Sequence, residues 1–129
     1  MATLKWFEDI EAWKRARILT RAVYECSKSR DFYRDYGLRE QIRRASVSVM
    51  SNIAEGFERG GKREFLQFLA VAKASAGEVE AQLYVALDQS YITADQFAML
   101  KDLAVSTKQL IGGFMRYLSE SNMKGVKYR

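Results

Sequence analysis

The side chains that could carry acid–base chemistry in this chain are carboxylates and lysines, because its 129 residues include no histidine. Glu55, Glu58 and Glu64 are close in sequence, and Glu78 could face Glu55 across a helical bundle. Di-metal carboxylate bundles use Glu-x-x-His pairs, however, which this chain cannot build. The lack of histidine also excludes a histidine-based triad, a zinc finger and a histidine-ligated metal. The sequence therefore predicts a protein that is not an enzyme, with no catalytic residue, metal or cofactor.

A second stretch whose residues could bind a ligand is Gly60-Gly61-Lys62-Arg63, which joins two predicted helices. The glycine pair is flexible, and the two cations would lie near the exposed amides that begin the second helix. An anion could bind there, although a simple turn between helices explains the same residues and is favoured. The stretch is not a Walker loop, because no strand precedes it and no Gly-Lys-Ser/Thr occurs in the chain.

Basic residues also recur at helical spacing near the N-terminus, in a chain whose formal net charge is +5. A stripe of this kind favours an acidic partner, of which nucleic acid is the commonest, although an ordinary solvated helix face would look the same. Further arginines follow in the next predicted helix and beside the glycine pair. The predicted nucleic-acid-binding residues are Lys14, Arg17, Arg21, Lys28, Arg39, Arg43, Arg44, Arg59, Lys62 and Arg63.

The chain contains no proline, and its apolar residues recur at steps of three and four, which predicts long helices. We expect helices at 8–29, 38–59 and 62–89, and a fourth that follows a turn at 90–97 and ends near 121. Thr93 and Gln96 have the spacing of a capping box. Helices of this length joined by short loops predict one domain over 1–129, an antiparallel up-down-up-down four-helix bundle with a short basic tail from about 122.

The predicted helix 38–59 has more than two faces. Its core face combines the apolar residues Leu38, Ile42, Ala45, Val49, Ile53 and Phe57. A polar stripe includes Ser48, Asn52 and Glu55, and Gly56 lies beside it. We interpret these four residues as structural, with Asn52 and Glu55 bonding across helices and the small residues allowing close approach, although a ligand-binding surface is the alternative. A third arc, turned away from the core, holds Val47, Met50 and Ala54 and predicts an oligomer interface.

Aromatic residues offer a further route to nucleic acid, because rings can stack on bases. The candidates are Trp6, Trp13, Phe32, Tyr33 and Tyr36. Most are explained more simply as packing residues. The segment 30–37 is predicted to be an aromatic-rich loop, and its exposed part, 31–37, is the one candidate among them for ligand contact. The predicted buried face of helix 8–29 is Ile10, Trp13, Ala16, Thr20, Val23, Tyr24 and Ser27.

Three segments give the chain a family resemblance: "WFEDIEAWKRA", "YGLREQIRRASVSVMSNIAEGFERGGKREFLQFL" and "AQLYVALDQSYI". Together they resemble the four-helix-bundle family of intervening-sequence proteins, named for reading frames inside inserts of bacterial large-subunit ribosomal RNA. That family is related to the accessory variability determinant of diversity-generating retroelements, which works with a reverse transcriptase and its RNA. The resemblance implies a homopentameric ring that binds nucleic acid. The family usually has proline where this chain has Met50, so an expected mid-helix kink is weakened or absent.

These observations favour a non-enzymatic, basic, cyclic homo-oligomer that binds nucleic acid, RNA rather than DNA, by charge and shape. The alternative is a protein-interaction scaffold, for example an accessory subunit of a reverse transcriptase. The single cysteine, Cys26, cannot form a disulfide within the chain. No signal-peptide pattern follows Met1 and no apolar run is long enough to cross a bilayer, which predicts a cytoplasmic protein without membrane contact.

Overall fold

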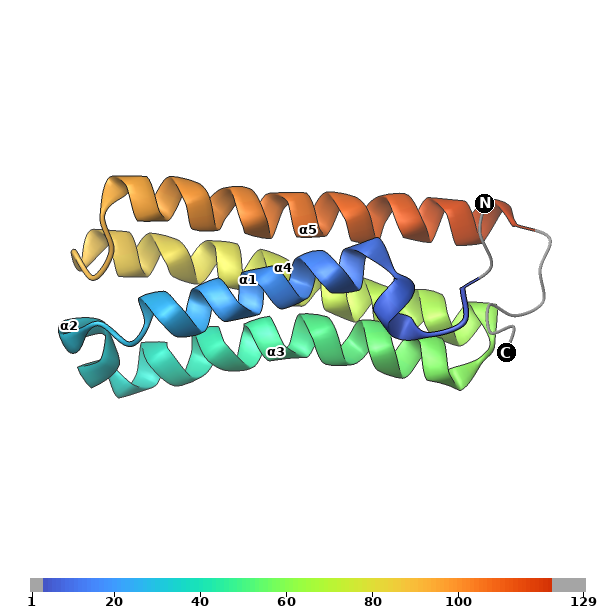
Figure 1. The fold of residues 1–129 in the computed structure, drawn as a ribbon, viewed down its shortest axis with the longest axis horizontal. Helices are drawn as coiled ribbons and strands as arrows, with labels where there is room; N and C mark the ends of the chain where they lie inside the picture. The colour runs from blue at the N-terminus through green and yellow to red at the C-terminus, as the bar shows by residue number, and fades with distance from the viewer. Residues whose placement is uncertain (1–3, 122–129) are drawn as a thin grey trace.

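The computed structural model describes residues 4–121, and every regular element among them is helical. Four long helices lie side by side: α1 (Glu11–Cys26), α3 (Tyr36–Arg59), α4 (Lys62–Asp88) and α5 (Ala94–Glu120) (Figure 1). A short 3₁₀ helix, η1 (Phe7–Asp9), precedes α1, and the five-residue helix α2 (Arg30–Arg34) joins α1 to α3. The predicted basic tail from about 122 lies outside the described residues.

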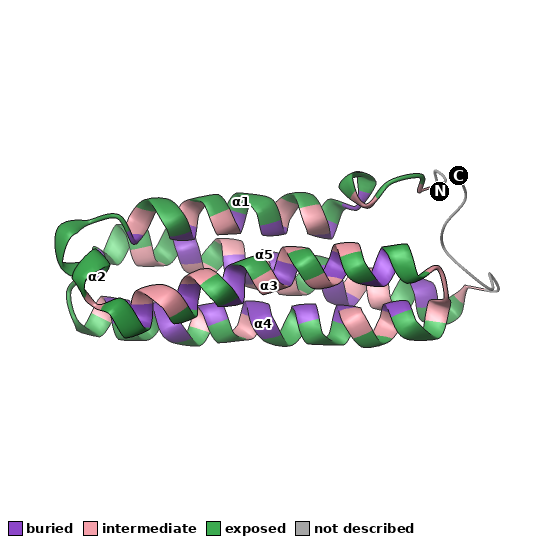
Figure 2. Ribbon diagram, turned by 90° about the horizontal axis from the view of Figure 1, so that it is seen from below, coloured by how far each residue is buried: buried purple, intermediate pink, exposed green. Residues whose placement is uncertain are grey.

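The long helices form a four-sided bundle in which α1 contacts α3 and α5, and α4 contacts the same two helices. Buried residues line the inward faces, as Figure 2 shows. The turn at 60–61 lies at one end of the bundle, whereas α2 and the turn at 89–93 lie at the other (Figure 1). None of the described helices is both long enough and apolar enough to cross a membrane.

The ends of the helices follow local signals in the sequence. Gly60 takes a left-handed conformation (φ 83°) that ends α3, because glycine has no Cβ to oppose it. Thr93 and Gln96 form the predicted capping box: Gln96 N–H donates to Thr93 Oγ1 at 3.1 Å, and Thr93 N–H donates to Gln96 Oε1 at 2.8 Å. Helix α5 therefore begins at Ala94, inside the stretch that was predicted to be a turn.

The loop predicted at 30–37 is wrong, because this stretch contains α2 and the start of α3. Asp35 holds the junction: its Oδ1 atom accepts the Leu38 N–H at 3.1 Å, which caps α3, and its Oδ2 atom accepts the Tyr91 hydroxyl at 2.9 Å. Phe32 is fully buried and stacks on Tyr91 with ring centroids 5.4 Å apart. A buried aromatic residue explains why this stretch is ordered against the bundle end.

The core face of α3 is confirmed, because all six of its predicted residues are buried. The prediction for α1 is partly wrong. Ala12 and Leu19 are buried there, whereas Trp13 and Thr20 are half-buried and Tyr24 is 38% exposed. The buried face of α1 is therefore Ala12, Ala16, Leu19 and Val23, because this helix packs against both α3 and α5. Tyr24 stays at the surface, where its ring centroid lies 4.5 Å from the guanidinium of Arg43 on α3.

Candidate nucleic-acid interface

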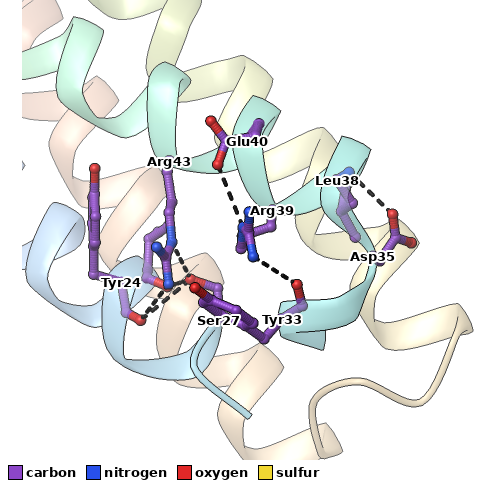
Figure 3. Close-up of polar contacts among 9 residues, drawn as sticks. Tyr24, Ser27, Tyr33, Asp35, Leu38, Arg39, Glu40 and Arg43 are labelled. Carbon is purple, nitrogen blue, oxygen red and sulfur yellow. Dashed lines mark hydrogen bonds and ion pairs between the residues drawn. The ribbon is translucent and has the colours of Figure 1, made fainter. Parts of the chain in front are cut away.

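Arg43 of α3 ties the C-terminal end of α1 to the neighbouring helix (Figure 3). Its Nε atom donates to Ser27 Oγ at 2.8 Å, and its Nη2 atom lies 3.5 Å from the Tyr24 carbonyl oxygen. Ser27 Oγ in turn donates to the Val23 carbonyl at 2.7 Å. The last carbonyls of a helix have no intrahelical partner, so a cation in this position both caps α1 and complements its dipole.

Arg39 makes the equivalent contact with α2. Its Nη1 atom donates to the Tyr33 carbonyl at 2.9 Å, and its Nε atom lies 3.4 Å from Glu40 Oε2 (Figure 3). The guanidinium lies between two rings, 4.1 Å from the centroid of Tyr33 and 4.7 Å from that of Tyr36. Only 11% of the Arg39 side chain is exposed, so this cation is largely committed to holding α2 on α3.

The two arginines and three tyrosines form one continuous stack. Arg43 lies 4.5 Å from the ring centroid of Tyr24 and 5.8 Å from that of Tyr33. The stack therefore runs Tyr36, Arg39, Tyr33, Arg43, Tyr24, and it crosses from α3 through α2 to α1. The rings remain accessible, with Tyr36 the most exposed at 68%. Each cation–π contact at an exposed site contributes about 0.5–1 kcal/mol, and the ring faces that are not covered still face solvent.

Beside the stack lies a recess of about 380 Å³, here called the Tyr24 recess. Its lining residues are Tyr24, Glu40, Arg43, Arg44, Val47 and Ser48. Arg44 is exposed and, within residues 4–121, has no hydrogen-bond or ion-pair partner. Two guanidinium groups against one carboxylate give the recess a positive balance, which suits an anionic group with a flat ring beside it.

The predicted stripe on α1 is exposed, and its residues recur with Tyr24 at steps of three and four, so they share the Tyr24 face of that helix. Lys14 pairs with Glu11 at 3.0 Å and Lys28 with Glu25 at 3.1 Å. Exposed pairs of this kind contribute only about 0–1 kcal/mol, so both lysines can exchange their partners for a phosphate. We call the Tyr24 recess together with the exposed cations Lys14, Arg17, Arg21, Lys28 and Arg44 the α1–α3 surface.

Of the remaining stripe residues, Arg17 lies 5.9 Å from the ring centroid of Trp13. Arg21 has no hydrogen-bond or ion-pair partner in the described part of the chain. Trp13 itself packs with Phe7 edge to face at 5.1 Å, and both support the core. Trp6 is 51% exposed, away from the aromatic stack.

The other predicted cations lie at the opposite end of α3, around the 60–61 turn. Arg59 pairs with Glu55 at 3.0 Å and lies 5.2 Å from the Phe68 ring centroid. Lys62 donates to the Ser121 carbonyl at 2.7 Å, so it caps α5 rather than standing beside the amides of α4. Arg63 is exposed. The structure therefore separates the ten predicted cations into two groups instead of one surface.

The polar stripe of α3 faces α4. Ser48 Oγ and Ser75 Oγ are 2.9 Å apart and join the two helices, and Asn52 Nδ2 donates to Ser48 Oγ at 3.0 Å and to its carbonyl at 2.8 Å. A Cβ atom at Gly56 would lie 2.7 Å from Phe68 Cβ, so this position requires close approach. The predicted cross-helix bonds of Asn52 and Glu55 are wrong: both side chains bond within α3, and Ser48 makes the bridge.

The apolar arc of α3 is less separate from the core than the sequence suggested. Val47 is 39% exposed and also lines the Tyr24 recess. Met50 is only half-buried, yet it packs against the core cluster that Phe7 also joins, so the prediction that it turns away from the core is wrong. The segment before α1 explains this, because η1 lies against α3. Ala54 is half-buried.

Sequence reasoning missed the role of Tyr24, which was assigned to the buried face of α1. No local signal identifies it, because its partner Arg43 is 19 residues away. Within residues 4–121, no group of three or more histidine, cysteine, aspartate or glutamate side chains is arranged to hold a metal ion.

The fold and this surface together define an all-helical bundle protein with a basic, aromatic-lined face. The chain belongs to the family of 23S rRNA-intervening sequence proteins, whose family model matches residues 8–113. A solved structure of similar fold is a protein with unknown function from the S23 ribosomal protein family from Bacteroides thetaiotaomicron VPI-5482. It is 20% identical, with a TM-score of 0.74, and the match covers 81% of this chain and 98% of that one. No curated protein matches the chain.

Proposed function

We propose that this protein is a non-enzymatic nucleic-acid-binding protein that holds structured RNA on its α1–α3 surface by charge and shape. The observation that carries the proposal is the Tyr24 recess, where exposed Arg44 and partly committed Arg43 lie beside an accessible ring. Phosphates would be bound by the exposed cations, and the ring would contact a sugar or base. The family description adds support, because it refers to an intervening sequence of 23S rRNA.

The arrangement favours recognition of shape over sequence. The cations stand along one helix and at one end of its neighbour, so they would follow a phosphate backbone rather than enter a groove to read base edges. Arg39 and Arg43 would contribute mainly by fixing the surface, since their donors are already engaged within the chain. Arg21 and Arg44 would make the direct contacts.

A filter-binding titration with a structured RNA at rising salt tests this proposal. Arg21→Gln/Arg44→Gln removes two cations from the surface, and Lys5→Gln/Lys101→Gln removes two charges elsewhere as a matched control. We expect the first double variant to bind at least about tenfold more weakly, with the salt slope reduced by about 2. The control variant loses the same number of charges from other places on the chain. Its affinity should therefore change by less than threefold, because only the overall charge of the protein is lowered.

Two results would count against the proposal. Absence of RNA binding by the wild-type protein at low salt would exclude it and leave the protein-scaffold alternative, such as a reverse-transcriptase subunit. Equal losses in the two double variants would show that binding depends on net charge and not on the α1–α3 surface.

We also infer that the chain, an antiparallel up-down-up-down bundle, forms a cyclic homo-oligomer, with a pentamer favoured by the family resemblance. The placement of successive turns at opposite ends supports the helix order. The proposed contact is Val47, Met50 and Ala54, with Val47 at its border with the Tyr24 recess, and it would meet a different surface of the next subunit in a closed ring. Light scattering tests this inference: a monomer at micromolar concentration would exclude the ring.

If the ring exists, Met50→Arg should dissociate it, because the charge would enter an apolar contact. Met50 also packs against the core, so the melting curve must be recorded alongside the mass. A folded monomer supports the contact, whereas a folded variant of unchanged mass places the interface elsewhere.

A further inference from the structure

A second recess lies between α4 and α5, on the opposite side of the bundle from the α1–α3 surface. We call it the Gly112 recess; its volume is about 380 Å³. Its lining residues are Lys73, Val105, Lys108, Gln109, Gly112 and Arg116. Three of these six residues are cationic and none is acidic. None of the three cations is among the basic residues that the sequence predicted to bind nucleic acid.

Two of the cations converge on one glycine. A Cβ atom built on Gly112 would lie 3.6 Å from Arg116 Nη1 and 3.7 Å from Lys73 Nζ. The two nitrogen atoms are therefore within about 7 Å of each other, close enough for mutual repulsion. Neither side chain has an ion-pair partner among residues 4–121. Lys108, by contrast, is neutralised by Glu80 at 2.6 Å.

Packing between helices does not explain the glycine. At Gly56 an added Cβ would lie within 3.0 Å of two phenylalanine side chains, so the bundle requires glycine there. At Gly112 the nearest atoms are the flexible ends of Lys73 and Arg116, at ordinary contact distance. Gly112 and Gly113 also stand inside α5, where glycine is unfavourable for the helix.

We propose that Lys73 and Arg116 bind a phosphate group over Gly112. Charge-assisted N–H···O bonds of about 2.8 Å on either side of one phosphate span a separation of this size. Both cations are the flexible ends of long side chains at ordinary contact distance from position 112, so they can close on an anion and can also shift around a small uncharged side chain there. The ligand class is a phosphate ester or an inorganic phosphate, supplied either by a nucleic-acid backbone or by a small molecule. This site does not depend on the α1–α3 surface.

The sharpest test replaces the anion with a carboxylate of the chain itself. Gly112→Asp would place its carboxylate between Lys73 and Arg116 and leave both cations present. Gly112→Asn has nearly the same shape without the charge, so it is the matched control. The probe is inorganic pyrophosphate, measured by isothermal titration calorimetry at low salt. We expect Gly112→Asp to abolish detectable pyrophosphate binding. Gly112→Asn should retain the wild-type affinity within about threefold, which corresponds to under half of the 1.4 kcal/mol that a tenfold change in affinity represents.

A second pair of variants tests the cations without changing α5 at the glycine. Lys73→Gln/Arg116→Gln should weaken pyrophosphate binding at least about tenfold, whereas Lys5→Gln/Lys101→Gln should not. Helical circular dichroism and melting curves confirm that each variant is folded. No pyrophosphate binding by the wild-type protein, or equal binding by Gly112→Asp and Gly112→Asn, would overturn the proposal.

The same two glycine variants identify the source of the phosphate. If a nucleic-acid backbone supplies it, Gly112→Asp should bind structured RNA more weakly than Gly112→Asn, with a smaller salt slope. If a small molecule supplies it, the two variants should bind RNA equally while differing in pyrophosphate binding. Because pyrophosphate binding is measured without RNA, failure of the RNA-binding function would leave this result intact.

Discussion

The Nε atom of Arg43 donates a 2.8 Å hydrogen bond to Ser27 Oγ, which joins the first half of α3 to the end of α1. Ser27 is fully buried, and its hydroxyl group donates a hydrogen bond to the Val23 carbonyl. An arginine predicted to face nucleic acid thus also holds two helices together. The same residue stacks against Tyr24, so stability and the shape of the Tyr24 recess depend on one side chain.

Arg43→Lys should therefore destabilise the fold although it keeps the charge. Lysine cannot reproduce the flat, forked contact with Ser27 and Tyr24, and we expect a loss of about 1–2 kcal/mol in the free energy of unfolding. Urea unfolding followed by circular dichroism measures the loss. Arg44→Lys is the matched control and should change stability by less than about 0.5 kcal/mol. Equal stability of the two variants would contradict the capping role of Arg43.

Gly56→Ala should lower stability, although alanine is the better helix former. The added Cβ would lie 2.7 Å from Phe68 Cβ and 2.8 Å from Phe65 Cδ1, and the Phe68 atom is attached directly to the backbone of α4. The helices must then separate, which costs about 1–3 kcal/mol and exceeds the gain of about 1 kcal/mol in helix propensity.

Gly77→Ala is the control for that comparison, because its nearest neighbour would be Lys108 Cδ at 3.9 Å. We expect this variant to gain about 0.4–1 kcal/mol. Thermal melts of both proteins under the same conditions decide the matter. Stabilisation of both would mean that α3 and α4 are not packed as closely as described.

Asn52→Ala should lower stability and leave RNA binding unchanged. The substitution removes the two bonds to Ser48, the residue that bridges to Ser75, and we expect a loss of about 1 kcal/mol. RNA affinity should stay within about twofold of the wild-type value, which corresponds to less than the 1.4 kcal/mol of a tenfold change in affinity. Ser51→Ala, at an exposed neighbouring position, serves as the control. Weaker RNA binding at unchanged stability would favour the polar stripe as a binding surface.

Cys26 should react slowly with iodoacetamide in the folded protein. Burial raises the pKa of its thiol from 9.0 to about 11, and the nearby Arg43 offsets only part of this effect. Because the thiolate is the reactive form, the rate should rise with pH up to about 11 when folded, but level off above pH 9 in urea. Mass spectrometry of the alkylated protein measures both rates.

The same shift in the pKa of Cys26 has a consequence for stability. Below pH 9 the thiol is protonated in both states and contributes no pH dependence. Between pH 9 and about 11 only the unfolded chain loses this proton, so stability should fall as pH rises. Cys26→Ala should flatten that part of the profile. An unchanged slope in this variant would assign the effect to other groups.

Local rules in the sequence were sufficient to place most of the helices. Gly60 predicted the end of α3, and the Thr93–Gln96 spacing predicted a capping box, because each signal acts within one helical turn. The helix that this box caps was expected only after residue 97, but α5 begins at Ala94. The core face of α3 was equally readable from its period, since a helix packed on one inner side shows a regular apolar stripe. The segment 30–37 was wrongly predicted to be a loop, because the five-residue helix α2 is too short to show a helical period.

Tertiary packing alone determined which charged residues act together. The sequence grouped cations by their spacing along a helix, but Lys62 caps α5 from 59 residues away, and Arg43 reaches back to α1. It gave no sign that Lys73 and Arg116 meet over Gly112, because they lie on different helices. The composition and period of this chain thus determined its helices and their core. The relative rotation of those helices decided which side chains face one another, since contacts across a bundle depend on packing between helices and not on spacing within one.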